Sequence, residues 1–115
     1  MIFRKARILV PFALVAAACS SAPAPLELTI TATDIAYDTS SISAQVGQTV
    51  NINFVNDGAL EHNFLIDAFG LDNLLESGES DLISFTPQEP GTYEFYCDVA
   101  GHLDAGMKGT LTVNE

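Results

Sequence analysis

Basic residues are scarce in this chain. Its 115 residues include only four Lys and Arg against fifteen Asp and Glu, and Arg4, Lys5 and Arg7 all lie at the N-terminus. Without that terminus, Lys108 is the single remaining cation and the formal charge is −14. Phosphate binding needs the opposite sign of charge, so nucleic acid is excluded as a partner. The acids are scattered along the chain, which favours a role in solubility over steering of basic partners, although both interpretations stay open.

Long hydrophobic runs are also lacking, except near the N-terminus. The three basic residues precede the apolar run from Ile8 to Ala18, which is the layout of a secretory signal peptide and is too short to span a bilayer stably. We therefore predict that residues 1–18 are a signal that is removed. In "LVAAAC", Cys19 follows small residues, as in bacterial lipoprotein processing sites, although Ala16 stands where such sites usually have leucine. The sequence favours a lipid anchor at Cys19, and ordinary cleavage after an Ala-x-Ala triplet is the alternative.

The sequence has few of the groups on which enzymes depend. Removing residues 1–18 leaves 97 residues, which is enough for one domain, predicted at 26–115 after a short linker at 19–25. The chain has two histidines, and it shows no Ser-His-Asp grouping, no Gly-rich phosphate loop and no second metal cluster. These features indicate a protein that is not an enzyme.

The alternation of apolar and polar residues in the domain indicates β-structure. Leu28, Ile30 and Ala32 alternate with threonines, and the stretch around Val50 to Phe54 alternates in the same way, as half-buried strands do. Further short strands separated by turns predict an all-β Greek-key β-sandwich of about seven or eight strands. Tyr93 is expected to pin a corner of it. The spacing of three leucines in "GLDNLLESG" predicts a short helix or irregular flap near residues 70–78.

Soft side chains are few, and they gather in one place. Cys97, His102 and Met107 follow one another at five-residue steps, with glycines directly before the last two, and His62 lies at the beginning of an earlier predicted strand. Two imidazoles, a thiolate and a thioether are the donors of a trigonal copper site with a weak axial methionine. Zinc is the alternative metal, but a thioether favours copper. Each residue alone is more simply a core or surface residue, whereas their joint placement favours a metal site.

The chain resembles the cupredoxins, the blue copper proteins related to plastocyanin and azurin. The segment "GTYEFYCDVAGHLDAGMKGTLTV" resembles their C-terminal ligand segment, and "EHNF" resembles their upstream histidine segment. The resemblance implies one type 1 copper held by His62, Cys97, His102 and Met107. It also implies that the backbone and side chain of Asn63 help to fix the ligand loop and donate to the thiolate, a turn asparagine being the alternative. Ala100 stands where many such loops have proline, and the loop spacing leaves the subfamily open.

The resemblance implies a function in electron transfer. A blue copper protein outside the cytoplasm would carry single electrons between partners such as c-type cytochromes or membrane oxidoreductase complexes. Electrons would leave through the edge of His102, beside Leu103 and Ala105, with Cys97 as a second route. We expect a monomer at the extracytoplasmic face of a membrane, in the periplasm or an equivalent space. The alternatives are a copper carrier that delivers the ion and a metal-free interaction domain.

Overall fold

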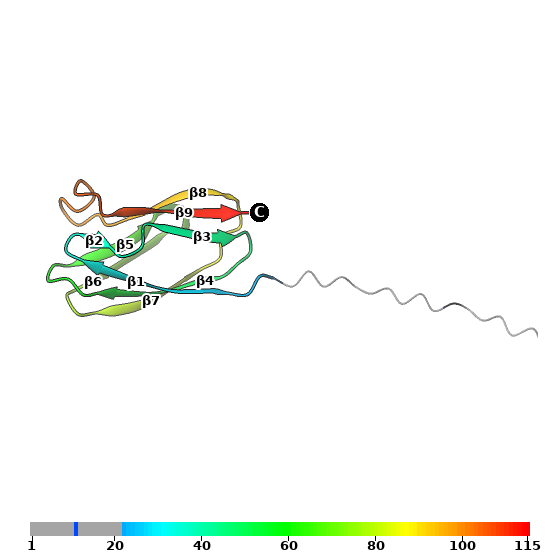
Figure 1. The fold of residues 1–115 in the computed structure, drawn as a ribbon, viewed down its shortest axis with the longest axis horizontal. Coiled ribbons are helices and arrows are strands. Elements are labelled where there is room, and N and C mark those ends of the chain that lie inside the picture. The colour runs from blue at the N-terminus through cyan, green and yellow to red at the C-terminus, as the bar shows by residue number, and fades with distance from the viewer. Residues whose placement is uncertain (1–10, 12–21) are drawn as a thin grey trace, which may run out of the picture.

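Nine strands form two sheets in the part of the chain that the computed structural model describes, residue 11 and residues 22–115 (Figure 1). The strands of the first sheet, in spatial order, are β2 (Ala36–Tyr37), β1 (Leu26–Thr33), β4 (Val50–Asn56) and β7 (Ser80–Phe85). Those of the second are β3 (Ser41–Gln45), β9 (Lys108–Asn114), β8 (Gly91–Tyr96), β5 (His62–Ile66) and β6 (Leu71–Leu75). The predicted all-β sandwich is confirmed. The predicted signal at 1–18 and Cys19 lie outside the described residues, apart from residue 11.

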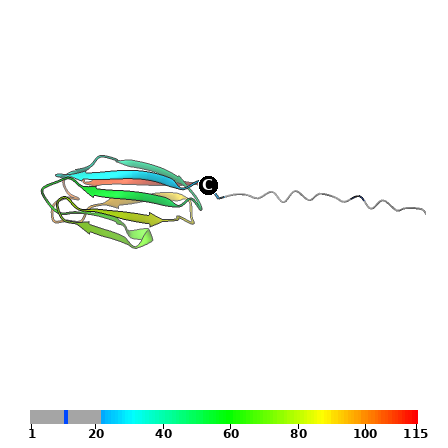
Figure 2. The same ribbon diagram turned by 90° about the horizontal axis from the view of Figure 1, so that it is seen from below.

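The pairing of the strands combines parallel and antiparallel ladders. β1 runs parallel to β4 and β3 runs parallel to β9, whereas the other neighbours are antiparallel. In both views the strands run along the length of the domain (Figure 1, Figure 2). No helix among the described residues is long and apolar enough to cross a membrane. Because the strands run lengthwise, the loops that join them lie at the two ends of the sandwich (Figure 1).

The core lies between the sheets and is rich in aromatic rings. The period-two pattern places Ile30, Ile52 and Phe54 inward, and all three side chains are fully buried. Phe64 on β5 stacks on Phe95 of β8 with ring centroids 5.1 Å apart, and it meets Phe54 of the facing sheet at 5.7 Å. Burial of such rings is the main favourable term for a small domain. It also ties the two sheets together beneath one end of the sandwich.

The prediction of a short helix or flap near residues 70–78 was wrong. Residues Leu71–Leu75 form strand β6, which pairs with β5 along its whole length. The side chain of Leu75 is buried and that of Leu74 is 55% exposed, so the leucines alternate and do not share a helical face. In so short a segment, leucines at positions 71, 74 and 75 fit the period of a helix as well as that of a strand. The segment becomes a strand because it pairs with the edge of β5 that β8 leaves free. One turn of 3-10 helix, η1 (Asp67–Phe69), precedes it and ends at Gly70.

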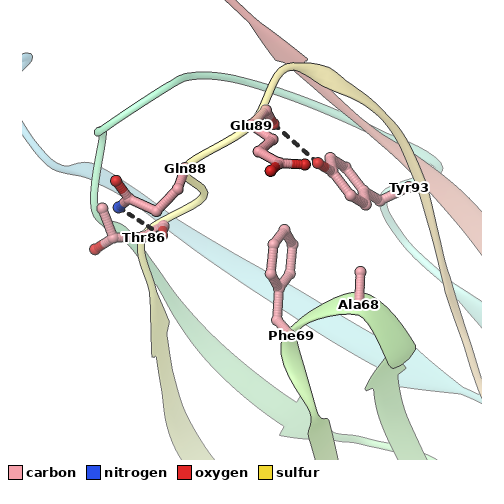
Figure 3. A pocket seen from close by; sticks show the side chains of 6 residues that line it. All are labelled: Ala68, Phe69, Thr86, Gln88, Glu89 and Tyr93. Atoms are coloured by element: carbon pink, nitrogen blue, oxygen red, sulfur yellow. Dashed lines mark hydrogen bonds between the residues drawn. The ribbon is translucent and has the colours of Figure 1, made fainter.

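Tyr93 pins a corner of the sandwich, as predicted. Its hydroxyl donates a hydrogen bond of 2.8 Å to the backbone carbonyl of Glu89, four residues earlier (Figure 3). The ring of Phe69 lies against it, with centroids 5.0 Å apart. These side chains line a surface hollow between η1 and the β7–β8 connection. The corner fixes the start of β8, and the other end of β8 leads to Cys97.

Candidate metal centre

Three strand termini bring the predicted ligands to one end of the sandwich. His62 is the first residue of β5, Cys97 directly follows β8, and Met107 directly precedes β9. Because β5 and β9 are both antiparallel to β8, these three positions lie at the same end. In Figure 1 the loop between β8 and β9 lies at the end of the domain opposite the C-terminus and the start of β1. We call residues 97–107 the ligand loop.

The ligand loop is folded tightly by its own backbone. The N–H of Cys97 donates to the carbonyl of Met107, and the N–H of Met107 donates to the carbonyl of His102, both at 3.1 Å. Gly101 and Gly106 have positive φ angles of 80° and 93°, which residues with a side chain rarely adopt. The glycines that precede two of the predicted ligands therefore permit the turns that bring all three loop residues together.

The nitrogen and sulfur donors converge in a buried cluster. One ligand atom each from His62, Cys97 and His102 lies within 4.8 Å of the others, and all three residues are buried. The Cys97 Sγ lies 3.4 Å from His102 Nδ1, and the two imidazole ring centroids are 4.8 Å apart. Met107, five residues after His102, is fully buried, and its backbone is hydrogen-bonded to Cys97 and His102. The structure thus brings together the residues that the sequence singled out.

An unsatisfied atom indicates what this cluster is for. His62 Nδ1 is fully buried and has no hydrogen-bond partner among the described residues, which costs roughly 1–3 kcal/mol in a protein interior. An ion bound beside the Cys97 sulfur would supply the missing partner for this lone pair. Two imidazoles and a thiolate with a methionine nearby suit copper better than the hard cations, which prefer oxygen. The donor set therefore fits the metal that the sequence predicted.

Asn63 connects the strand of the first histidine to the ligand loop. Its Oδ1 accepts the backbone N–H of Asp98 at 2.9 Å, and its Nδ2 donates to the carboxylates of Asp98 and Asp72 at 2.5 and 3.3 Å. This agrees with a role in fixing the loop. In the described part of the chain the amide donates to these carboxylates and not to the Cys97 sulfur. The half-buried Tyr37 donates a hydrogen bond from its hydroxyl to the Asn63 carbonyl.

Asp34 is a residue of the site that sequence reasoning missed. Its carboxylate oxygen Oδ1 lies 2.8 Å from His62 Nε2, on the opposite side of the ring from the unpaired Nδ1. The backbone N–H of Ala59 and the His62 ring hold the pKa of the Asp34 carboxyl below its usual value. One acid among fifteen, in a turn 28 residues before His62, carries no local pattern that marks it.

Apolar side chains surround the centre on the outside. Ile35, Leu60 and Leu103 are among the few large hydrophobic residues of the described chain with substantial exposure, at 37, 46 and 37%. Ile35 lies in the turn after β1, next to Asp34, and Leu60 lies in the loop that leads into His62. Leu103 lies in the ligand loop, next to His102. His102 itself is 4% exposed, so the buried centre lies just beneath the surface of this end.

Comparison with known proteins agrees with the geometry. The model of the cupredoxin-like domain family matches residues 6–113. Plastocyanin of Daucus carota is 34% identical over 91 residues, covering 69% of this chain and 88% of that protein. Auracyanin-B of Chloroflexus aurantiacus is 52% identical over 40 residues, which is 35% of this chain but only 17% of that protein. The chain also spans just 47% of the Physcomitrium patens plastocyanin, to which it is 35% identical.

Solved structures give the same result. Auracyanin of Roseiflexus castenholzii superposes with a TM-score of 0.70 at 28% identity, covering 81% of this chain and all of that one. A copper nitrite reductase of Nitrosomonas europaea has a TM-score of 0.68 at 19% identity, which shows a shared fold alone. With the matched domain, the sandwich and the converging donors, this chain belongs to the cupredoxin-like domain family.

Proposed function

We propose that this protein is a type 1, or blue, copper protein that carries single electrons between redox partners outside the cytoplasm. One copper ion is held by His62, Cys97 and His102, with Met107 as the weak axial ligand. The observation that carries this proposal is the buried cluster of three donors within 4.8 Å, in which one imidazole nitrogen has no partner in the described part of the chain. When bound, copper supplies a one-electron couple, whose potential the axial ligand tunes.

Similar proteins support this choice of metal and chemistry. Auracyanin A of Chloroflexus aurantiacus, whose structure matches with a TM-score of 0.67 at 26% identity, is described as a "blue" copper protein. The structure of the Roseiflexus castenholzii auracyanin is described as that of the Na-dithionite reduced protein, so this relative accepts electrons. Substrate turnover forms no part of the proposal, because both histidines of the chain belong to one centre and leave none for a general base.

The chain's own residues suit fast electron exchange. The ligand loop is fixed by its internal hydrogen bonds and by Asn63, so the donors keep their places when the charge of the site changes. Burial of the cluster keeps water away from the sulfur. The ring edge of His102 lies just beneath a surface that carries Leu103 and Ala105 together with Ile35 and Leu60. A partner that docks on this apolar end would approach the centre closely without displacing a polar shell.

The position of the N-terminal end is consistent with membrane attachment. We place the protein at the extracytoplasmic face, anchored through a lipid on Cys19 by the linker at 19–25, as a monomer. β1 begins at Leu26, at the end of the sandwich opposite the ligand loop (Figure 1). An anchor there would leave the centre facing away from the bilayer, toward partners such as c-type cytochromes or membrane oxidoreductase complexes. Mass spectrometry of the exported protein would reveal diacylation of Cys19, and an unmodified N-terminus would refute the anchor.

Spectroscopy of the copper-loaded protein tests the function directly. The wild-type protein with Cu(II) should show an intense visible band from charge transfer between thiolate and copper. Replacing Cys97 with alanine should abolish that band, and a folded β-sheet circular dichroism spectrum should remain. Leu82→Ala is a matched control, because Leu82 is 78% exposed on β7 and the substitution should leave the band unchanged. A wild-type protein without the band is not a blue copper protein.

Redox cycling distinguishes the shuttle from a copper carrier. An electron carrier should be reduced and reoxidised repeatedly without loss of metal, since its buried donors retain the ion in both oxidation states. A carrier should instead release Cu(I) readily to a chelator. Full retention of copper after several cycles supports electron transfer, and transfer of most of the Cu(I) to the chelator would contradict it.

A further inference from the structure

Asp34 is hydrogen-bonded to the loop before β5 and to His62, the first residue of that strand. Its Oδ1 lies 2.8 Å from His62 Nε2 and accepts the backbone N–H of Leu60 at 3.2 Å. Its Oδ2 accepts the backbone N–H of Ala59 at 2.9 Å. One carboxylate in the turn after β1 therefore bonds to two backbone N–H groups of the loop before β5 and to the ring of the first residue of β5. The side chain of Asp34 is 33% exposed, whereas the His62 ring is fully buried.

The contact determines which nitrogen of His62 carries the proton. An ionised carboxylate can only accept hydrogen bonds, so the neutral ring must place its hydrogen on Nε2 and its lone pair on Nδ1. Nδ1 is the buried atom without a partner beside Cys97 and His102. Asp34 thus presents His62 in the tautomer that a metal at the cluster requires.

Space for this contact is made by a missing side chain. A Cβ built on Gly58 would lie 2.3 Å from Asp34 Oδ1 and 2.9 Å from His62 Nε2, which is far inside contact distance. Gly58 has no positive φ, so its backbone conformation would accept other residues. Its N–H donates to Asn56 Oδ1 and its carbonyl accepts the Ser77 hydroxyl, which keep it in place. Glycine at 58 is needed to leave room for the pair.

The two imidazoles of the cluster are therefore electrostatically different. Across the described residues, the His102 ring has no hydrogen bond to a carboxylate; its partner is the Cys97 sulfur. A carboxylate behind a ligating imidazole raises the basicity of that ring, and mutation of such a partner typically lowers metal affinity 10- to 100-fold. Its negative charge also favours the ion of higher charge. Cu(II) gains more than Cu(I) from both effects.

From this geometry we propose that Asp34 is a positioning residue that selects the Nδ1-ligand tautomer of His62 and lowers the reduction potential of the copper centre. The proposal rests on the copper site proposed above. Asp34→Asn removes the charge and offers an amide N–H that can donate to His62 Nε2. A tenfold loss of Cu(II) affinity relative to Cu(I) raises a one-electron potential by 59 mV. We expect the potential of Asp34→Asn to rise by at least about this amount.

The first measurement needs no copper. Nitrogen-15 spectra of the metal-free protein, at a pH where imidazole is neutral, report which ring nitrogen of His62 is protonated. The wild type should show the proton on Nε2, and Asp34→Asn should shift the population toward Nδ1. Asp57→Asn is the control, because it removes one charge from the loop before His62, where Asp57 is exposed and its carboxylate accepts no hydrogen bond within the described chain. An unchanged tautomer in Asp34→Asn would overturn the proposal.

The second measurement is the potential of the copper-loaded variants by voltammetry. Asp34→Asn should lie well above the wild type, while Asp57→Asn should shift little because its charge is screened by solvent. Equal potentials for these two variants would also overturn the proposal. If Asp34→Asn fails to fold, Gly58→Ala replaces it: the methyl group separates the intact carboxylate from the ring and should cause the same two changes. Absence of the blue band in the wild type would refute the copper function, and the tautomer measurement would still decide the role of Asp34.

Discussion

The pairing of Phe95 with Gly109 provides a severe test of how the core holds the metal centre. These residues face each other across β8 and β9, two positions before Cys97 and two after Met107. A Cβ built on Gly109 would lie 2.1 Å from Phe95 Cζ, 2.5 Å from Cε2 and 2.8 Å from Cε1. Gly109 has no positive φ, so its backbone conformation would accept other residues. It is the ring of Phe95 that leaves no room for a side chain at position 109. Gly109→Ala therefore forces the ring of Phe95 to move.

The cost of this movement follows from the surroundings of the ring. Phe95 is fully buried, with Phe64 stacked at 5.1 Å and Tyr37 edge-on at 5.6 Å between ring centroids. Overpacking of a filled core costs about 1–3 kcal/mol, and we expect about 3 kcal/mol because the ring is enclosed. For a domain of this size that lowers the melting temperature by roughly 12–24 °C. The visible band of the copper form should shift as well, since the displaced strands carry the thiolate and the thioether.

Thermal unfolding followed by circular dichroism measures this loss, with two comparison variants. Gly47→Ala meets no atom within 4 Å, and its positive φ of 78° should cost only about 1 kcal/mol without changing the copper spectrum. Adding Phe95→Leu to Gly109→Ala should recover part of the loss, which a double-mutant cycle reveals as a positive coupling. A Gly109→Ala protein that melts within a few degrees of the wild type would show that this reasoning is wrong.

Three other perturbations have defined outcomes. Removing copper with a chelator should lower the melting temperature, because a ligand at 100 times its Kd adds about 2.7 kcal/mol to stability; equal melting of both forms would refute the site. Tyr93→Phe removes the corner hydrogen bond and should cost about 1 kcal/mol in denaturant unfolding without moving the blue band. The hydrogen bond to Asp67 raises the pKa of Tyr96 to about 12. The folded state thus holds this proton more tightly than the unfolded state, so the free energy of unfolding falls as the pH rises from 10 to 12. Asp67→Asn should lower the pKa of Tyr96, which ultraviolet titration of the phenol measures.

The donors of the metal centre could be predicted because their residue types are rare. One cysteine, one methionine and two histidines follow the predicted linker at 19–25, and three of them fall in one loop with a glycine before each of the last two. The period-two alternation around Ile30 and Ile52 likewise predicted buried strands correctly. These signals are local, because residue type and spacing alone determine which side chains bind soft metals and which faces become buried.

Other features were beyond local reasoning. The segment at 71–75 contains leucines at helical spacing, but the exposed hydrogen-bonding edge of β5 makes it a strand, and that edge exists only after the sheet has formed. The side-chain partners of Asn63 could not be predicted either, because its Nδ2 donates to the carboxylates of Asp72 and Asp98, which arrive from β6 and from the ligand loop. In both cases the deciding partner comes from a distant part of the chain.

Residue types and periodicity by themselves determined that this chain is a β-sandwich with a soft-metal donor set near its C-terminus. The tertiary structure decided how that set is arranged and supported. His62 joins Cys97 and His102 only because β5 runs antiparallel to β8, and Asp34 stands out among fifteen acids only because the turn after β1 lies behind the His62 ring. The physical reason is that bonding preferences belong to single side chains, whereas distances between remote residues are set by the packing of the whole sandwich.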